Sequence, residues 1–273
     1  MADNQELKSR ISELGLRPKE FFKVDIGPVV LDGWMIKPIQ FDPQKKYPVI
    51  FHVYGEPAGS TVQDNWGTGD NMWHQYLANE LGCIVISVDN RGTKVPRGRD
   101  FRKCIYRQIG LLAADDQAAA AKKIMQTYSF IDSAHVGMWG WSGGGQMTLH
   151  GLFRHGNVFK TGIAVSFVAL QTLYDNVYQE RYMGLPEDNK YGYKEGSPLT
   201  HAGKLQGKLM IIHGTGDDNV HYQNFEMMVN ELIKNNKLFS MMSYPNRDHG
   251  IWQGVNTTLH LRRTMEQFWK LNL

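Results

Sequence analysis

The chain has 273 residues, of which 42% are hydrophobic and 21% are charged, so it can bury a large core without disulfides or structural metals. Its formal net charge is only +3, and its Lys and Arg residues are scattered among acidic ones, which argues against a nucleic-acid partner. No apolar run reaches the roughly 18 residues of a membrane span, so no membrane partner is expected either.

The N-terminus lacks the basic start and apolar run of a signal peptide. We therefore expect a cytoplasmic protein as written, or a periplasmic or secreted one if the chain was cut from a longer precursor. The two cysteines, Cys83 and Cys104, cluster neither with each other nor with His, which predicts packing residues and no metal site. Without repeats or linkers, residues 1–273 are interpreted as one domain, in which residues 1–20 form an amphipathic lead-in.

The lead-in is followed by two alternating segments, 21–26 and 31–36, which flank a turn at Gly27-Pro28 and predict a pair of strands. Beyond them, short apolar runs typical of strands buried on both faces alternate with helical segments. This alternation predicts an α/β fold with a mostly parallel central sheet and helices on both faces, and chemistry at the carboxyl ends of the strands. The predicted strands are 47–54, 83–88, 135–139, 161–165, 208–212 and 238–242, and the predicted helices are 71–81, 113–127, 145–153, 222–234 and 257–271.

The pentapeptide Gly140-Trp141-Ser142-Gly143-Gly144 lies between a predicted strand and a helix that is expected to begin near Gly145. This is the strand-turn-helix setting of the nucleophile elbow in the α/β-hydrolase fold. The glycines are needed because a Ser on so sharp a turn requires the strand before it and the helix after it to pack closely. Ser142 is therefore the candidate nucleophile.

A serine nucleophile needs a His base held by a carboxylate, and this fold places them after the Ser in the order acid, then His. The loop after strand 208–212 offers Asp217 and Asp218, between which the residue pattern does not decide, and the loop after strand 238–242 offers His249. His213 sits too close to its strand to reach back, so we expect it to bond the acid loop. His221 and His260, which lie at or in predicted helices, are expected to be surface or packing residues.

An oxyanion hole needs two hydrogen-bond donors that point at the developing charge. The backbone N–H of Gly143, directly after the candidate nucleophile, supplies the first. The loop after strand 47–54 normally supplies the second, and Tyr54 offers a phenol hydroxyl there.

These residues resemble the prolyl oligopeptidase family of serine peptidases, and within it the catalytic domain of enzymes similar to dipeptidyl peptidase IV. The resemblance implies that Asp217 is the acid and that Tyr54 completes the oxyanion hole. The segments that carry it are Val53-Tyr54-Gly55, Asp89-Asn90-Arg91-Gly92-Thr93, Asp116-Gln117, Gly140-Trp141-Ser142, the stretch from Tyr178 to Gly184, the stretch from His213 to His221, and Asp248-His249-Gly250.

The resemblance also implies a small apolar pocket for the Pro or Ala next to the scissile bond. Its lining would be Val168, Tyr174, Tyr178 and Val220, with Asn219 bonding the preceding peptide carbonyl. Aromatic walls suit a flat proline ring because they offer area with few rotamers to freeze.

Two residues depart from the family pattern in this pocket. Gly143 stands where the mammalian-type enzymes carry Tyr, and Gln171 stands where they carry Trp; both changes are expected to open the pocket. The family's β-propeller, which supplies the acidic pair that grips a substrate's amine, has no counterpart in these 273 residues.

The sequence thus predicts a serine hydrolase that acts through an acyl-enzyme, as a peptidase cleaving after Pro or Ala, with no metal or organic cofactor. The alternative is a carboxylesterase acting on small esters, because an ester needs less protonation of its leaving group and the propeller has no counterpart here. An inactive hydrolase serving as a binding module is disfavoured because every expected catalytic residue is present. The family often dimerises through its last helices, so the segment 268–271 suggests a homodimer, although an apolar helix face is more often core.

Overall fold

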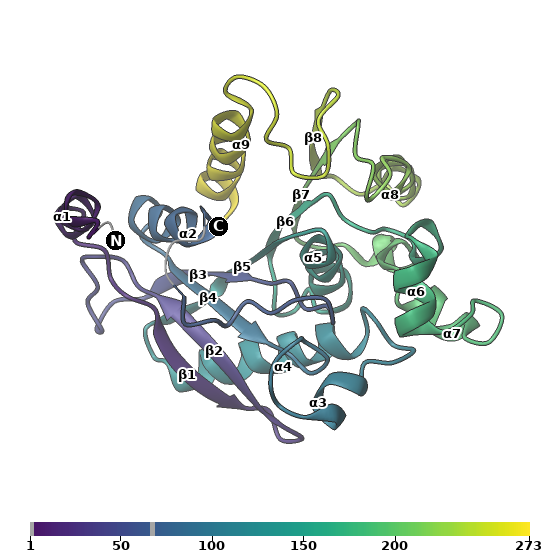
Figure 1. Cartoon of the computed structure of the whole chain (residues 1–273), viewed down its shortest axis with the longest axis horizontal. Helices are drawn as coiled ribbons and strands as arrows, with labels where there is room; N and C mark the ends of the chain where they lie inside the picture. The colour runs from purple at the N-terminus through teal and green to yellow at the C-terminus, as the bar shows by residue number, and fades with distance from the viewer. Residues whose placement is uncertain (1–2, 66–68) are drawn as a thin grey trace.

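A computed structural model describes residues 3–65 and 69–273, and its centre is an eight-stranded sheet (Figure 1). Neighbouring strands follow the order β1-β2-β4-β3-β5-β6-β7-β8. The first two strands form a hairpin that joins β4 antiparallel, whereas all pairs from β4 to β8 are parallel. The strands are β1 Glu20–Asp25, β2 Val30–Ile36, β3 Tyr47–His52, β4 Ile84–Asp89, β5 Ile131–Trp141, β6 Thr161–Val165, β7 Lys208–Gly214 and β8 Ser240–Tyr244.

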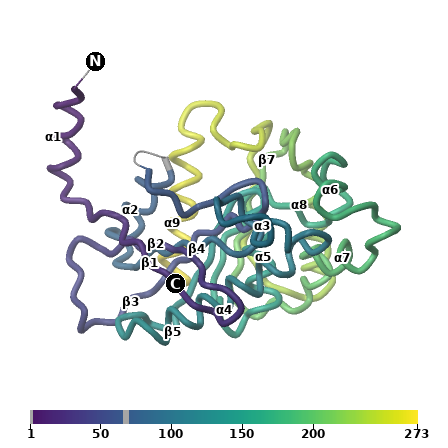
Figure 2. The backbone as a smooth tube through the Cα atoms, turned by 60° about the horizontal axis from the view of Figure 1, so that its bottom comes forward, coloured from purple at the N-terminus to yellow at the C-terminus, as the bar shows by residue number. Residues whose placement is uncertain are grey.

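Helices cover both faces of this sheet, and α1 stands apart from the body without a buried residue (Figure 2). Trp73 and Leu77 of α2 share one apolar cluster with Met265 and Trp269 of α9. The opposite face packs against α4, α5 and α8. The helices are α1 Gln5–Glu13, α2 Gly69–Glu80, α3 Arg99–Lys103, α4 Leu112–Thr127, α5 Gly143–Arg154, α6 Asn176–Met183, α7 Lys190–Glu195, α8 Gln223–Lys234 and α9 Thr257–Asn272, with 3₁₀ turns at Gln171–Leu173 and Pro198–Lys204.

Strand β4 shows why the apolar runs of the sequence are continuous. Ile84 and Ile86 face the cluster that includes α4, while Val85 between them faces the cluster of α2 and α9. Because successive side chains of a strand point to opposite faces, a strand covered on both sides buries consecutive apolar residues, as Ile84 to Ile86 do here. The α/β fold predicted from these runs, and the α/β-hydrolase type predicted from the elbow, are confirmed.

All predicted strands and helices are present, with ends that differ by a few residues. The helix after the elbow, predicted to begin near Gly145, begins two residues earlier at Gly143, directly after the serine. The first turn of this helix consists of glycines, whose low helix propensity gave no helical signal in the sequence. The sequence also gave no signal for the short helices α3, α6 and α7.

Half of the segment suggested as a dimer surface is core. Phe268 and Trp269 are buried against the sheet, whereas Lys270 and Leu271 are exposed. Cys83 is buried and Cys104 is half-buried, consistent with packing roles. Over residues 3–65 and 69–273, no helix combines the length and apolar character that crossing a bilayer requires.

Candidate active site

Ser142 lies on a sharp turn between β5 and α5. Its backbone angles, φ 59° and ψ −120°, are ones that residues with a Cβ rarely adopt, and such strain persists only where the surroundings determine it. The Ser142 N–H donates to the carbonyl of Val165 at 2.8 Å, which ties the turn to the end of β6. The side chain is thereby held at the carboxyl edge of the sheet.

Two glycines allow this turn to pack against the end of β3. A Cβ on Gly144 would lie 2.1 Å from the Val53 carbonyl oxygen, and a Cβ on Gly140 would lie 2.5 Å from the same atom. Both distances are too short for any real side chain. The spacing of glycines around Ser142 therefore has the mechanical cause that the sequence suggested.

Asp217 follows β7 and is only 5% exposed. Its Oδ1 accepts hydrogen bonds from the N–H groups of Asn219 (3.0 Å) and Val220 (2.8 Å). Its Oδ2 lies 2.8 Å from His249 Nδ1 and 3.1 Å from His213 Nε2. Burial alone would raise the pKa of Asp217, but these hydrogen bonds, led by those from the two histidines, outweigh it and hold the pKa well below its usual range.

The hydrogen-bond partners fix the tautomers of both histidines. His249 Nδ1 faces a carboxylate oxygen, which can only accept, so Nδ1 carries the hydrogen and, in the neutral imidazole, Nε2 has the lone pair. This is the form that a general base needs. His213 Nε2 faces two acceptors, Asp217 Oδ2 and the Val220 carbonyl at 2.8 Å, so it is a donor that braces the acid loop, as predicted.

The structure separates the two candidate acids that the residue pattern left open. Asp217 is buried and contacts His249, whereas Asp218 is exposed. The other two histidines considered, His221 and His260, are also exposed.

Trp141 brings the His249 loop to the elbow. Its indole Nε1 donates to the His249 carbonyl oxygen at 2.8 Å, and the Ser166 hydroxyl donates to the same oxygen at 3.3 Å. Among residues 3–65 and 69–273, no hydrogen bond joins the Ser142 hydroxyl to the His249 imidazole. Catalytic hydrogen bonds are often long without substrate. The bond from Trp141, the residue before Ser142, to the His249 carbonyl is therefore the contact that joins the elbow to the His249 loop.

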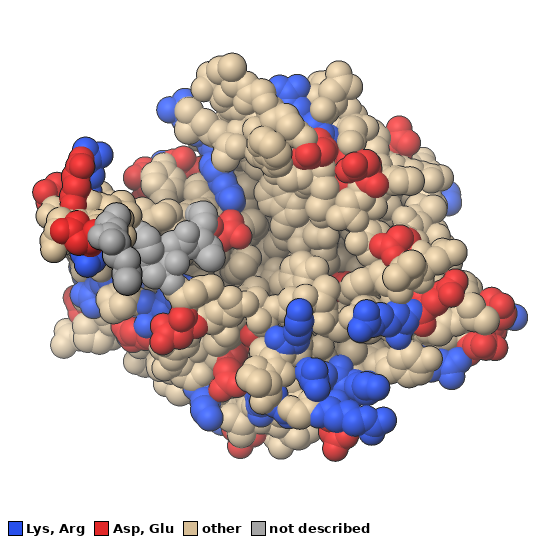
Figure 3. All heavy atoms as spheres, in the orientation of Figure 1, with Lys and Arg blue, Asp and Glu red and all other residues tan. Residues whose placement is uncertain are grey.

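The two predicted oxyanion donors lie beside Ser142. Tyr54 and Ser142 line one cavity of about 370 Å³, and Figure 3 shows a face of the molecule that is hollowed near its centre. Burial, reinforced by the nearby Glu56, raises the pKa of the Tyr54 phenol, so its hydroxyl stays protonated and can donate. Gly143 is the first residue of α5, and its N–H therefore has no acceptor within the helix.

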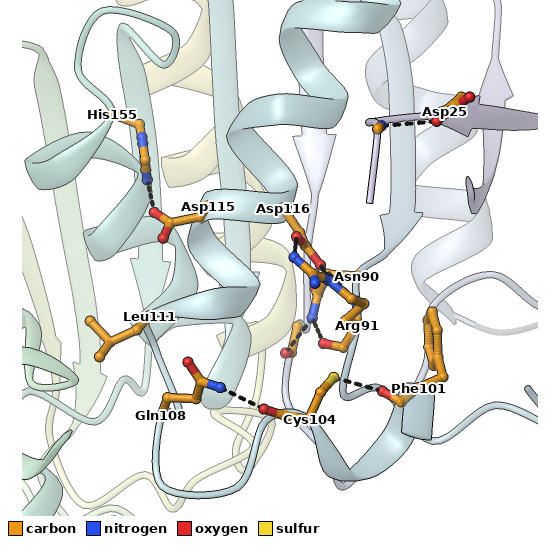
Figure 4. A network of polar contacts seen from close by, with 12 residues as sticks. Asp25, Asn90, Arg91, Phe101, Cys104, Gln108, Leu111, Asp115, Asp116 and His155 are labelled. Carbon is orange, nitrogen blue, oxygen red and sulfur yellow. Dashed lines mark hydrogen bonds and ion pairs between the residues drawn. The ribbon is translucent and has the colours of Figure 1, made fainter. Parts of the chain in front are cut away.

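A polar network behind the oxyanion loop was not assigned a role from the sequence (Figure 4). Arg91 forms a bidentate pair with Asp116 of α4, at 2.7 Å and 3.0 Å. The preceding Asn90 donates to the Gly55 carbonyl at 3.0 Å and accepts from Gln117 Nε2 at 2.9 Å. These residues thus hold the loop that carries Tyr54, and the only signal for them was the motif they share with the resembled family.

The predicted pocket residues do not line the cavity that holds Tyr54 and Ser142. Val168 and Val220 are buried, and the rings of Tyr174 and Tyr178 meet edge to face with centroids 5.3 Å apart. The Tyr174 hydroxyl donates to Asn219 Oδ1 at 2.9 Å. This bond occupies the amide oxygen of Asn219 and leaves its NH₂ group as a donor.

The two positions that were expected to open the pocket, Gln171 and Gly143, each contact side chains from other segments. Gln171 is buried, and its side chain is held by Gln179 and by the Gly196 carbonyl at 2.7 Å and 2.9 Å. Beside Gly143 lies the side chain of Glu56, whose Cγ would be 2.6 Å from a Cβ at position 143. The expectation that Gly143 leaves an open wall is therefore wrong, because a residue from another loop fills the space.

Comparisons with known proteins show which proteins this chain is similar to. A family model described as the prolyl oligopeptidase family matches residues 70–273. Human prolyl endopeptidase FAP is 35% identical over 273 residues, covering 99% of this chain and 35% of the relative. A probable dipeptidyl-aminopeptidase B from Uncinocarpus reesii is 38% identical over 259 residues, covering 92% of this chain and 27% of the relative.

A solved structure is also similar to the whole of this chain and is itself much longer. The crystal structure of Porphyromonas gingivalis dipeptidyl peptidase 4 is 42% identical and superposes with a TM-score of 0.95, over 100% of this chain and 38% of that one. The chain thus spans about a third of the length of the relatives it matches.

Proposed function

Because the chain belongs to the prolyl oligopeptidase family, we propose that it is a serine peptidase acting through an acyl-enzyme and cleaving after Pro or Ala. The observation that carries this proposal is the 2.8 Å hydrogen bond from His249 Nδ1 to the buried carboxylate of Asp217, on loops that meet the Ser142 elbow. A carboxylate, an imidazole in the basic tautomer and a strained serine are the parts that acyl transfer requires.

In the proposed reaction, His249 Nε2 takes the proton of the Ser142 hydroxyl while Oγ attacks the substrate carbonyl. Tyr54 and the Gly143 N–H stabilise the negative charge on the carbonyl oxygen. The imidazolium then gives its proton to the leaving amine as the C–N bond breaks, which leaves the acyl group on Ser142. A water molecule then attacks the acyl group while His249 takes its proton. The imidazolium returns a proton to Ser142 Oγ as the acyl–oxygen bond breaks, which releases the carboxylic acid product and restores the enzyme.

The substrate class rests on the pocket and on the names of the relatives. The pocket is the one that the resemblance implies: Val168 and Val220 are buried apolar residues and Tyr174 contacts Tyr178, while the NH₂ of Asn219 is left as a donor for a peptide carbonyl. Relatives named prolyl endopeptidase and dipeptidyl peptidase support a peptide substrate with Pro near the scissile bond.

The test is paired hydrolysis of Gly-Pro 4-nitroanilide and 4-nitrophenyl acetate by the wild type and by Ser142→Ala. We expect the wild type to cleave both and Ser142→Ala to lose about 10⁶-fold in kcat, as losing a triad serine does elsewhere. Ser243→Ala, which removes a hydroxyl at the end of β8, is the matched control and should keep its activity. Cleavage of the ester alone would replace the peptidase by a carboxylesterase, and equal turnover by Ser142→Ala would remove Ser142 from the site.

A further inference from the structure

Glu56 is a buried carboxyl group for which the proposed reaction has no use. It lies two residues after Tyr54 and is only 5% exposed. Its Oε2 accepts a short hydrogen bond from the Tyr178 hydroxyl, while its Oε1 is buried with no partner among the described residues. An incompletely bonded buried carboxyl is costly, so its position calls for an explanation.

The side chain of Glu56 occupies the space beside the residue that follows the nucleophile. A Cβ on Gly143 would lie 2.6 Å from Glu56 Cγ, 2.9 Å from Cδ and 3.2 Å from Cβ. The two positions therefore exclude one another: a side chain at 143 requires Glu56 to move, and Glu56 requires a glycine at 143.

Glu56 also reaches across to α6. Its bond with Tyr178 joins the oxyanion loop to a helix that contributes an aromatic wall of the candidate pocket, and the Tyr178 ring packs between Tyr174 and Tyr182 with centroids 5.3 Å and 4.8 Å away. Burial raises the pKa of Glu56 to about 7, and the Tyr178 hydrogen bond only partly offsets this. The groups facing the carboxyl are the tyrosines Tyr54 and Tyr178.

We propose that Glu56 is a specificity-determining residue of the acyl pocket, which closes the pocket beside Gly143 and fixes the Tyr178 ring so that only a small residue fits next to the scissile bond. The inference rests on the proposed function, because it takes the pocket to hold the acyl side of the substrate. In this proposal the pocket wall beside the nucleophile is the side chain of Glu56, from the oxyanion loop, and not a side chain at position 143 of the elbow.

The test compares substrates that differ only in this residue: N-acetyl-Ala and N-acetyl-Leu 4-nitrophenyl esters, with the matching 4-nitroanilides. Glu56→Ala should raise kcat/KM for Leu relative to Ala at least tenfold, mainly through KM, because a methylene-sized change in a pocket is worth about 10- to 200-fold. Glu56→Gln keeps the shape and should keep the ratio within about threefold of the wild type. Glu180→Ala, an exposed glutamate on α6, is the control for general effects on that helix.

A second arm tests the steric exclusion directly. Gly143→Ala should lower kcat/KM for the Ala ester in the wild type, and the loss should be at least tenfold smaller in the Glu56→Ala background, where only the 3.2 Å contact remains. An unchanged Leu-to-Ala ratio in a folded Glu56→Ala protein, or additive effects of the two substitutions, would overturn the assignment.

The two proposals fail in different ways. If the wild type cleaves the esters but not the anilides, the peptidase function fails, while the ester ratios still decide the role of Glu56. If neither substrate class is cleaved, both proposals fall together.

Discussion

Two buried carboxyl groups flank the candidate nucleophile, and they behave in opposite ways. Asp217 and Glu56 are each 5% exposed, yet the pKa of Asp217 is held below its usual range and that of Glu56 is raised to about 7. Asp217 accepts four hydrogen bonds, two from backbone N–H groups and two from imidazoles. Glu56 accepts one, from Tyr178.

The comparison teaches that burial alone does not decide the charge of a carboxyl group. Burial raises both pKa values, and the number of donors determines whether the charged form is restored. One carboxylate is therefore suited to hold a charge during a reaction, and the other is suited to form a wall.

The largest expected effect comes from removing the charge of Asp217. Asp217→Asn keeps the size of the side chain, but it should lower kcat about 10⁴-fold because the amide no longer selects the basic tautomer of His249, as in other triads. Asp218→Asn, the exposed neighbour, should leave kcat unchanged. Steady-state hydrolysis of the nitrophenyl ester measures both, and a mild Asp217→Asn phenotype would erase the distinction between the two carboxyl groups.

The next effect concerns Tyr54, which lies two residues before Glu56 and lines the same cavity as Ser142. Tyr54→Phe should cost about 2.7 to 4 kcal/mol of transition-state stabilisation, or roughly 10²- to 10³-fold in kcat, because it removes one oxyanion donor. The change should appear in kcat more than in KM. Unchanged turnover would take Tyr54 out of the oxyanion hole.

Removing the single donor of Glu56 should act on stability. Tyr178→Phe should lower the free energy of unfolding by about 1 to 3 kcal/mol at pH 8, since it leaves a buried carboxylate unpaired. Urea denaturation across pH measures the effect, and Tyr182→Phe on the same helix is the control.

The sign of the pH dependence follows from the raised pKa of Glu56. The stability this group contributes is fully present below its ordinary value of 4.5 and is lost as the pH rises through about 7. Tyr178→Phe raises the folded-state pKa further, so the two proteins should differ little below pH 5 and most above pH 8. A difference that does not vary with pH would show that Glu56 stays in one protonation state.

The smallest effect is expected for Trp141→Phe, which removes the indole donor to the His249 carbonyl. One hydrogen bond of this kind contributes about 0.5 to 1.5 kcal/mol to stability, and kcat should fall only severalfold because Asp217 still orients the imidazole. Thermal denaturation measures the change in stability, and ester hydrolysis measures the change in kcat. A loss of kcat as large as that of Asp217→Asn would mean that Trp141, and not the acid, positions the base.

The parts of this fold that obey simple patterns could be predicted from the sequence. Continuous apolar runs gave the buried strands, and the elbow could be found because glycine spacing reports a backbone constraint at Ser142. The choice between Asp217 and Asp218 could not be made from the pattern, since it depends on which side chain a loop turns inward. Glu56 was missed for a similar reason: its effect depends on a contact with Gly143, 87 positions away along the chain, which no local pattern contains.

The four donors around Asp217 also bear on the cost of moving charge in the proposed reaction. When His249 becomes an imidazolium, the neighbouring dipoles must match a new charge distribution. The N–H groups of Asn219 and Val220 already point at Oδ1, so few of them have to turn. In water, solvent dipoles would have to reorient around the new charge at every turnover. Here the N–H dipoles are oriented once, when the protein folds, so this reorganisation free energy does not add to the barrier of each reaction.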